Sequence, residues 1–227
     1  MIKVLVIAAH PDDEVLGLGG TIKKHVNQGD LVRCLILGEG VTSRKSSCED
    51  AQKAAVDSLH KHAIQSAKTI GYEKIFFANL PDNRFDSVNL LDIIKIIEEY
   101  VEVVRPDIIY THHYGDLNID HRVTFEAVLT ACRPVGDDSV KEIYSFETPS
   151  STEWNFKYGE SSFKPNVFVD VTDTIDDKLK AISCYKSELR EYPHPRSLEA
   201  LKIIAAKWGT VIGKKYVEAF ELIRKVR

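Results

Sequence analysis

The 227-residue sequence has few cysteines, no long apolar run and no excess of positive charge. The cysteines, Cys34, Cys48, Cys132 and Cys184, are scattered without a Cys-x-x-Cys pair, which argues against disulfides and a thiolate zinc site. The apolar run Lys3–Ala8 is too short for a membrane span and lacks a cleavage site. A net charge of −4 argues against nucleic-acid binding. We therefore expect a cytoplasmic protein with reduced thiols.

The chain is long enough for one domain, residues 1–227, with a full hydrophobic core. Short apolar, β-branched segments alternate with segments that have helical spacing of apolar residues. The predicted strands are Lys3–Ala8, Leu31–Leu37, Lys74–Ala78, Asp107–Thr111, Glu142–Phe146 and Asn166–Val171. The predicted helices are Glu14–Gln28, Cys48–Gly71, Leu90–Val104, His121–Arg133, Asp173–Leu189 and Leu198–Trp208.

This alternation predicts an α/β fold: a Rossmann-like, doubly wound, mostly parallel sheet with helices on both faces, in three layers. The loops that follow parallel strands meet at one edge of the sheet, where open α/β sheets hold their ligands. Four polar loops should therefore lie together there: His10–Glu14, Glu39–Arg44, Asp82–Arg84 and His112–His121.

The stretch Ala9–Glu14 carries more charge than the start of a helix needs. His10, Asp12, Asp13 and Glu14 directly follow the first predicted strand. One acidic side chain is enough to cap a helix N-terminus, so the surplus indicates a functional site. Imidazole and carboxylate ligands suit a borderline metal such as zinc.

The loop His112–His121 is a second cluster of histidines and aspartates. A hydrolytic zinc site needs three protein ligands and an open position for water. His10 and Asp13 supply two ligands, and we choose His121 as the third. Asp12, beside a ligand but free of the metal, would accept a proton from the water, which is worth ~10²–10⁴-fold in rate. The alternative is a polar surface loop with incidental histidines.

The motif Ala9-His10-Pro11-Asp12-Asp13-Glu14, with Gly17, Gly19 and Gly20 and the downstream Asp116-x-Asn118-x-Asp120-His121-Arg122, resembles the LmbE/PIG-L family. Members are zinc-dependent de-N-acetylases that act mostly on N-acetylglucosamine-type sugars in glycolipids, thiols and glycans. The similarity also covers Gly40–Arg44, Leu80–Asn83, Pro193–Ser197 and Tyr216–Phe220. The resemblance implies an LmbE-like fold and one Zn²⁺ per chain, although such ligands also tolerate Fe²⁺.

The resemblance also implies roles for residues that match the family's motifs. His10, Asp13 and His121 would be the zinc ligands. Asp12 would be the general base, and Arg44 would bind the substrate.

One position departs from the family's pattern. Many members have a histidine three residues before the last ligand, where it steadies the oxyanion or protonates the leaving amine, and this chain has Asn118 there. The amide of Asn118 can donate a hydrogen bond to an oxyanion but cannot deliver a proton. Either Asp12 carries the proton in both directions, or another imidazole acts, with His113 and His194 as candidates.

The remaining residues at the predicted edge have more general expected roles. Asp120 either fixes the tautomer of a neighbouring histidine or caps the helix that starts at His121. We expect further substrate contacts from Asp82, Arg84, His113 and Asp116.

The sequence thus predicts a hydrolase that removes an N-acetyl group from a small amino-sugar substrate. One alternative is a zinc amidase on a non-sugar amide, and another is a non-catalytic module that binds a metal or a sugar nucleotide. The free carboxylate of Asp12 has no use in a non-catalytic module. We expect no nucleic-acid partner and no membrane span, and a homo-oligomer is compatible with the sequence.

Overall fold

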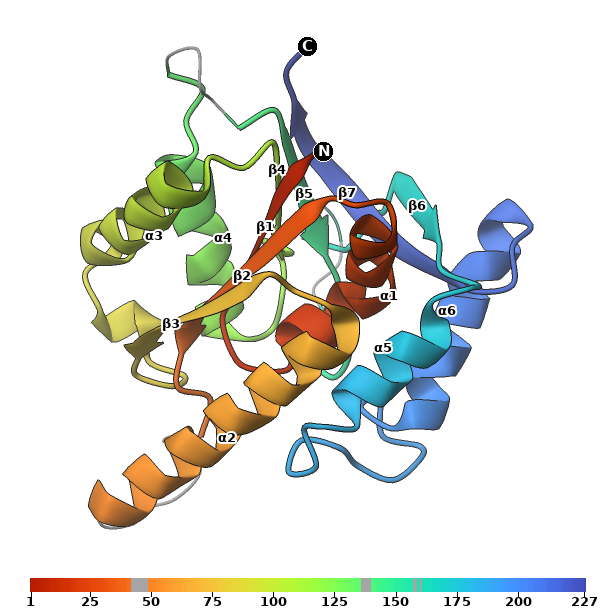
Figure 1. Ribbon diagram of the computed structural model, residues 1–227, viewed down its shortest axis with the longest axis horizontal. Coiled ribbons are helices and arrows are strands. Elements are labelled where there is room, and N and C mark those ends of the chain that lie inside the picture. The colour runs from red at the N-terminus through yellow and green to blue at the C-terminus, as the bar shows by residue number, and fades with distance from the viewer. Residues whose placement is uncertain (42–48, 136–139, 157–158, 160) are drawn as a thin grey trace.

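The computed structural model describes the chain except for residues 42–48, 136–139, 157–158 and 160. A seven-stranded sheet runs through the molecule in the order β3-β2-β1-β4-β5-β7-β6 (Figure 1). The strands are β1 (Lys3–Ala8), β2 (Leu31–Gly38), β3 (Lys74–Leu80), β4 (Ile108–His112), β5 (Glu142–Phe146), β6 (Val167–Asp170) and β7 (Val217–Lys225). Strands β3, β2, β1, β4 and β5 pair in parallel, whereas β7 is antiparallel to both β5 and β6.

Helices cover both faces of the sheet, as the alternating pattern predicts. They are α1 (Asp13–Asn27), α2 (Glu49–Ile70), α3 (Leu90–Val104), α4 (Ile119–Ala131), α5 (Ile175–Ile182) and α6 (Leu198–Ile212), with a short 3₁₀ helix η2 (Phe85–Ser87). Successive side chains of a strand point to opposite faces. Val4 and Val6 of β1 therefore pack in the core with α1, α2, α5 and α6, whereas Leu5 and Ile7 pack with α3 and α4 (Figure 1). The three-layer α/β fold is confirmed.

Helix α5 and strand β7 differ most from the sequence prediction. Helix α5 ends at Ile182 rather than Leu189, because the chain continues in tight turns that bring the buried Tyr185 against α1, where its hydroxyl donates to Glu14 Oε1 at 2.5 Å. Strand β7 was not predicted, since its first five residues are all buried and show no alternation of polar and apolar side chains. Helix α4 also begins earlier than predicted, at Ile119.

Small residues let α1 lie close to the sheet. A Cβ at Gly17 would collide with the ring of Phe146, and one at Gly20 would lie 2.9 Å from Val171. This close packing places α1 against the end of β5 and against the residue that follows β6. Among the described helices, none is both long and apolar enough to cross a membrane.

Candidate metal centre

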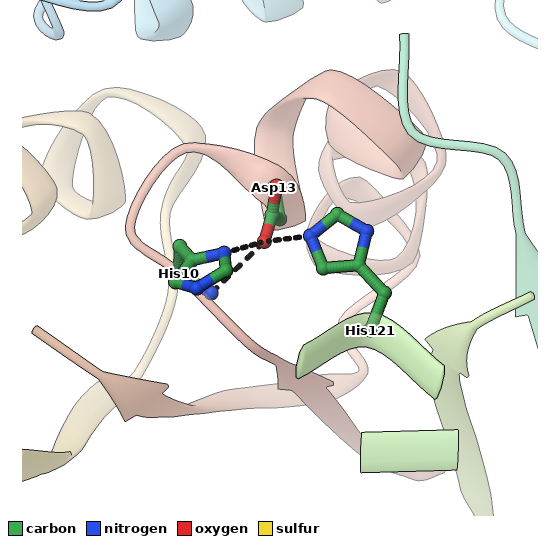
Figure 2. A group of neighbouring side chains, drawn as sticks. All are labelled: His10, Asp13 and His121. Carbon is green, nitrogen blue, oxygen red and sulfur yellow. Dashed lines mark hydrogen bonds and ion pairs between the residues drawn. The ribbon is translucent and has the colours of Figure 1, made fainter. Parts of the chain in front are cut away.

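Three predicted ligands from two distant segments lie together where β1 and β4 end. His10 and Asp13 follow β1, and His121 lies in the first turn of α4. One ligand atom from each lies within 4.8 Å of the others. Asp13 Oδ2 is 3.4 Å from His10 Nδ1 and 3.3 Å from His121 Nε2. Figure 2 shows both imidazoles turned toward this carboxylate.

The backbone of the first motif leaves its carboxylates available for chemistry. Asp12 precedes α1 with φ 109°, a conformation that costs a non-glycine residue of order 1–3 kcal/mol. The carbonyl of Asp12 accepts from the N–H groups of Val15 and Leu16, but its side chain makes no capping hydrogen bond. Asp13 Oδ2 accepts from the backbone N–H of His10 at 2.9 Å. Capping of α1 therefore does not explain Asp12 and Asp13, whereas Glu14 Oε2 accepts from the N–H of the N-cap residue Asp12 at 3.0 Å.

Asp120 holds the imidazole of His10 from the side away from Asp13. His10 Nε2 lies 2.9 Å from Asp120 Oδ2, and the carboxylate also accepts from the N–H groups of Asn83 at 2.7 Å and Phe85 at 2.9 Å. An Nε2–H that donates to Asp120 leaves the lone pair of Nδ1 for a metal. The N-cap of α4 is Asn118, whose Oδ1 accepts from the N–H of Asp120 at 2.8 Å, so Asp120 is not the cap.

Asp116 plays the corresponding part for His121. Its Oδ1 lies 3.1 Å from His121 Nδ1, which leaves Nε2 facing Asp13. The carboxylate is fully buried and accepts hydrogen bonds from the hydroxyls of Ser151 and Thr152. The carboxylate of Asp116 therefore lies behind His121, and the expected contact of Asp116 with substrate stays a prediction.

Three buried atoms without a hydrogen bond test whether a cation fits. Within the described part of the chain these are Asp13 Oδ1 and both ring nitrogens of His121, of which Nδ1 lies 3.1 Å from Asp116 Oδ1. Buried polar atoms nearly always have a partner. A cation between the two imidazoles and the carboxylate of Asp13 would give His121 Nε2 a partner, and this donor set suits zinc or iron(II).

The charges of the centre favour binding of a cation. Burial alone would lower the pKa of His10, but hydrogen bonds to Asp120 and Asp13 outweigh it and raise the pKa to about 10. In His121, burial is likewise outweighed by the charges of Asp13 and Asp116, which raise its pKa to about 9. Burial opposes the charge of Asp13, yet the neighbouring histidines hold its pKa well below the usual value. The surrounding carboxylates therefore create a site for positive charge.

The predicted base Asp12 is 2% exposed and pairs with an arginine from the far end of the chain. Arg196 Nη1 lies 3.0 Å from Asp12 Oδ2 and 3.5 Å from Glu188 Oε2. Arg196 Nε donates to Ser150 Oγ at 2.7 Å. Burial raises the pKa of Asp12 well above its usual value, and the charge of Arg196 opposes that shift.

The two histidines proposed as proton donors are placed differently. His113 is buried, with Nδ1 2.9 Å from Glu221 Oε2 and Nε2 3.0 Å from the carbonyl oxygen of Ser161. Both nitrogens of His113 are therefore engaged inside the fold, and the substrate contact and proton transfer expected of it stay predictions.

His194 is linked to Asp12 through Arg196, which contacts both residues. Its Nδ1 accepts from the backbone N–H of Arg196 at 3.1 Å, and its ring packs edge-on against Trp154. Burial, followed by the charges of Arg196 and Arg190, lowers its pKa. The neutral imidazole therefore carries its hydrogen on Nε2, where it can donate a hydrogen bond.

Of the other predicted substrate residues, the structure describes Asp82 and Arg84. Asp82 is buried, and its Oδ1 lies 3.4 Å from His10 Nε2, on the same side of the ring as Asp120. Arg84 is exposed between β3 and η2. Asn118 Nδ2 donates to Asn83 Oδ1 at 3.0 Å. Arg44 lies outside the described residues.

Sequence reasoning missed two residues that border the centre. His112 stacks on His121 with ring centroids 3.9 Å apart, and it accepts a hydrogen bond from the N–H of Ala9 at 2.9 Å. Arg196 belongs to the segment Pro193–Ser197, which the family resemblance already included. That segment was the available signal for Arg196, whereas nothing local distinguishes His112 from His113.

Comparisons with known proteins bear on the family and the fold of this chain. The PIG-L family model, described as GlcNAc-PI de-N-acetylase, matches residues 5–132. Diacetylchitobiose deacetylase of Thermococcus kodakarensis is 29% identical, over 97% of this chain and 83% of that protein. The structure of N,N'-diacetylchitobiose deacetylase from Pyrococcus horikoshii aligns with a TM-score of 0.78 and 25% identity, over 97% of this chain and 83% of that one. A 4-oxalmesaconate hydratase of Pseudomonas putida is 27% identical, over 80% of this chain and 72% of that protein.

Proposed function

Since this chain belongs to the PIG-L family, we propose that it is a metal-dependent N-deacetylase that releases acetate from an N-acetylated amino sugar. The observation that carries the proposal is the arrangement of four side chains at the ends of β1 and β4. His10, Asp13 and His121 form a three-ligand cluster, and Asp12 adds a carboxylate that is not part of it. A site that only bound a metal would not need the additional acid.

His10, Asp13 and His121 would hold one divalent ion, zinc or another such as iron(II). When bound, such an ion supplies Lewis acidity, which polarises an amide carbonyl and makes water easier to deprotonate. Asp120 and Asp116 keep the two imidazoles oriented for this task through their other nitrogens.

Asp12 is the proposed carrier of the proton. It accepts a proton from water as the water oxygen attacks the acetyl carbon, and it gives that proton to the nitrogen as the C–N bond breaks. The products are acetate and the free amine. Asp12 is preferred in both directions because His113 is engaged inside the fold and the pKa of His194 is lowered.

Asn118 is the proposed donor to the oxyanion. Its Oδ1 caps α4, and its Nδ2 donates to Asn83, which together fix the plane of the amide. The second N–H of the amide is the donor available for the developing charge. Arg44 and Arg84 stay proposed contacts for the sugar or for the group attached to it.

The names of the deacetylase relatives support the amino-sugar substrate, and the hydratase relative defines a competing reaction. The test measures acetate release from N-acetylglucosamine, diacetylchitobiose and N-acetylated sugar nucleotides by zinc-loaded protein. Aryl acetamides and unsaturated tricarboxylates are assayed in parallel. Release from at least one sugar, in preference to the aryl acetamides, is expected. Turnover of only the aryl acetamides or only the tricarboxylates would reject the proposal.

The role of Asp12 is tested by Asp12→Asn. Acetate release should fall by ~10²–10⁴-fold, because the variant loses its general base. Metal content should stay at the wild-type level, whereas Asp13→Asn should lower it. Loss of the metal from Asp12→Asn, with retention in Asp13→Asn, would show that the roles of the two aspartates are exchanged.

A further inference from the structure

The half-buried guanidinium group of Arg196 links Asp12 to two segments that lie far from it in sequence. Arg196 Nη1 is 3.0 Å from Asp12 Oδ2, and Arg196 Nε donates to Ser150 Oγ at 2.7 Å. Glu188, which is 2% exposed, lies 3.5 Å from the same Nη1. The side chain of Arg196 is 21% exposed, whereas the side chain of Asp12 is 3% exposed.

Only one oxygen of the Asp12 carboxylate has a side-chain partner among the described residues. Its Oδ2 accepts a hydrogen bond from Arg196 Nη1. The main chain of Asp12 is held by hydrogen bonds to Glu14, Val15 and Leu16, so the arginine acts on the direction of the side chain. With Oδ2 held, Oδ1 is the oxygen that remains to receive a proton.

We propose that Arg196 is the positioning residue of the general base: anchored on Ser150 and Glu188, its guanidinium holds Oδ2 of Asp12 so that Oδ1 takes the proton of the attacking water. This inference rests on the proposed function of Asp12. Arg196 does not touch the reacting atoms in this scheme. It acts through Asp12. A lysine could reproduce its charge but not the hydrogen bonds that the planar guanidinium donates in two directions, to Asp12 and to Ser150.

The first test compares Arg196 with Arg190, which lies six residues earlier in the chain. In Arg196→Ala, kcat for acetate release should fall by about 100-fold, because a displacement of ~1 Å in a catalytic group costs that much. KM and metal content should not change. Arg190→Ala is the matched control, since the hydrogen bonds of Arg190 go to the carbonyls of Ser187 and Leu189 in its own segment. This control should keep the wild-type kcat.

Chemical rescue distinguishes two roles of Arg196: positioning of the Asp12 carboxylate, and a purely structural contribution to the fold. Guanidinium chloride, at concentrations that do not denature the protein, should restore the kcat of Arg196→Ala in a saturable way, and the same addition should not raise that of Arg190→Ala. Wild-type kcat in Arg196→Ala, or a loss that guanidinium does not restore, would overturn the proposal. If Arg196→Ala does not fold, Arg196→Lys and Ser150→Ala replace it, and wild-type kcat in both would overturn the proposal.

Failure of the proposed function would look different, because the wild-type protein itself would then release no acetate. In that case, a double-mutant cycle on the thermal unfolding midpoint tests the contact between Arg196 and Asp12 on its own. Arg196→Met and Asp12→Asn should shift the midpoint non-additively if the guanidinium holds Asp12 in solution. Additive shifts would overturn the contact itself, whatever the enzyme does.

Discussion

Asp116 and Asp120 each contact one imidazole of the candidate metal centre at the nitrogen that faces away from Asp13. Asp120 contacts His10 Nε2, and Asp116 contacts His121 Nδ1. Both carboxylates are fully buried. Such partners fix the tautomer and the ring orientation of a ligand, so they affect metal affinity without touching the ion.

Asp116→Asn should therefore lower zinc affinity by roughly 10–100-fold, because the amide supports His121 less well than the carboxylate does. Competition with a chromophoric chelator measures this affinity. Asp86→Asn, at an exposed carboxylate in η2, is the matched control and should bind zinc as the wild type does. Equal affinities for the two variants would contradict the role assigned to Asp116.

Helix α1 is interrupted where it passes β7. Leu18 has φ −144° and ψ 22°, which breaks the helical hydrogen bonding. The carboxylate of Glu218 in β7 replaces the missing helical acceptors: it accepts from the N–H groups of Gly20 at 3.0 Å and Thr21 at 2.7 Å. The same carboxylate pairs with buried Lys178 of α5 at 2.7 Å. The unpredicted strand β7 thus supplies the side chain that keeps α1 in place above the sheet.

Glu218→Ala should reduce the free energy of unfolding by about 3–5 kcal/mol, because it leaves the charge of Lys178 buried without its partner. Urea unfolding followed by circular dichroism measures the change. The double variant Glu218→Gln, Lys178→Met removes the charge as well, so it should be more stable than Glu218→Ala. A Glu218→Ala protein as stable as the wild type would rule out this account of the break.

In the whole molecule, Asp107 joins the starts of three neighbouring strands. It accepts from the backbone N–H of Lys3 and from Lys141 Nζ, each at 3.0 Å. The hydrogen bond from Lys3, helped by Lys141, lowers the pKa of Asp107. A carboxyl group whose pKa is lower in the folded protein stabilises the fold above its unfolded pKa, ~3.9, and loses this effect as pH falls through the folded pKa.

The stability of Asp107→Asn should therefore depend on pH in a defined way. The variant should be less stable than the wild type at neutral pH, and the difference should shrink as the pH falls below the unfolded pKa of ~3.9. Urea midpoints across an acid series measure the difference. A gap that stayed constant down to the lowest pH would exclude the carboxylate charge as its cause.

The sequence by itself determined the fold class and the residues that gather at the site. Hydrophobic periodicity is local, so the alternation of strands and helices could be read along the chain, and parallel strands necessarily bring the ends of β1 and β4 to one edge. Excess acid at one helix start and a histidine-rich loop marked His10, Asp12, Asp13 and His121 without any tertiary information.

Only the tertiary structure decided which neighbours these residues have. Asp12 meets Arg196 across 184 positions, and His113 meets Glu221 across 108. No local pattern shows that Asp116 lies behind His121, or that β7 enters the sheet between β5 and β6. Residue type and spacing specify what a side chain can do, but which atom it faces depends on how distant elements pack together.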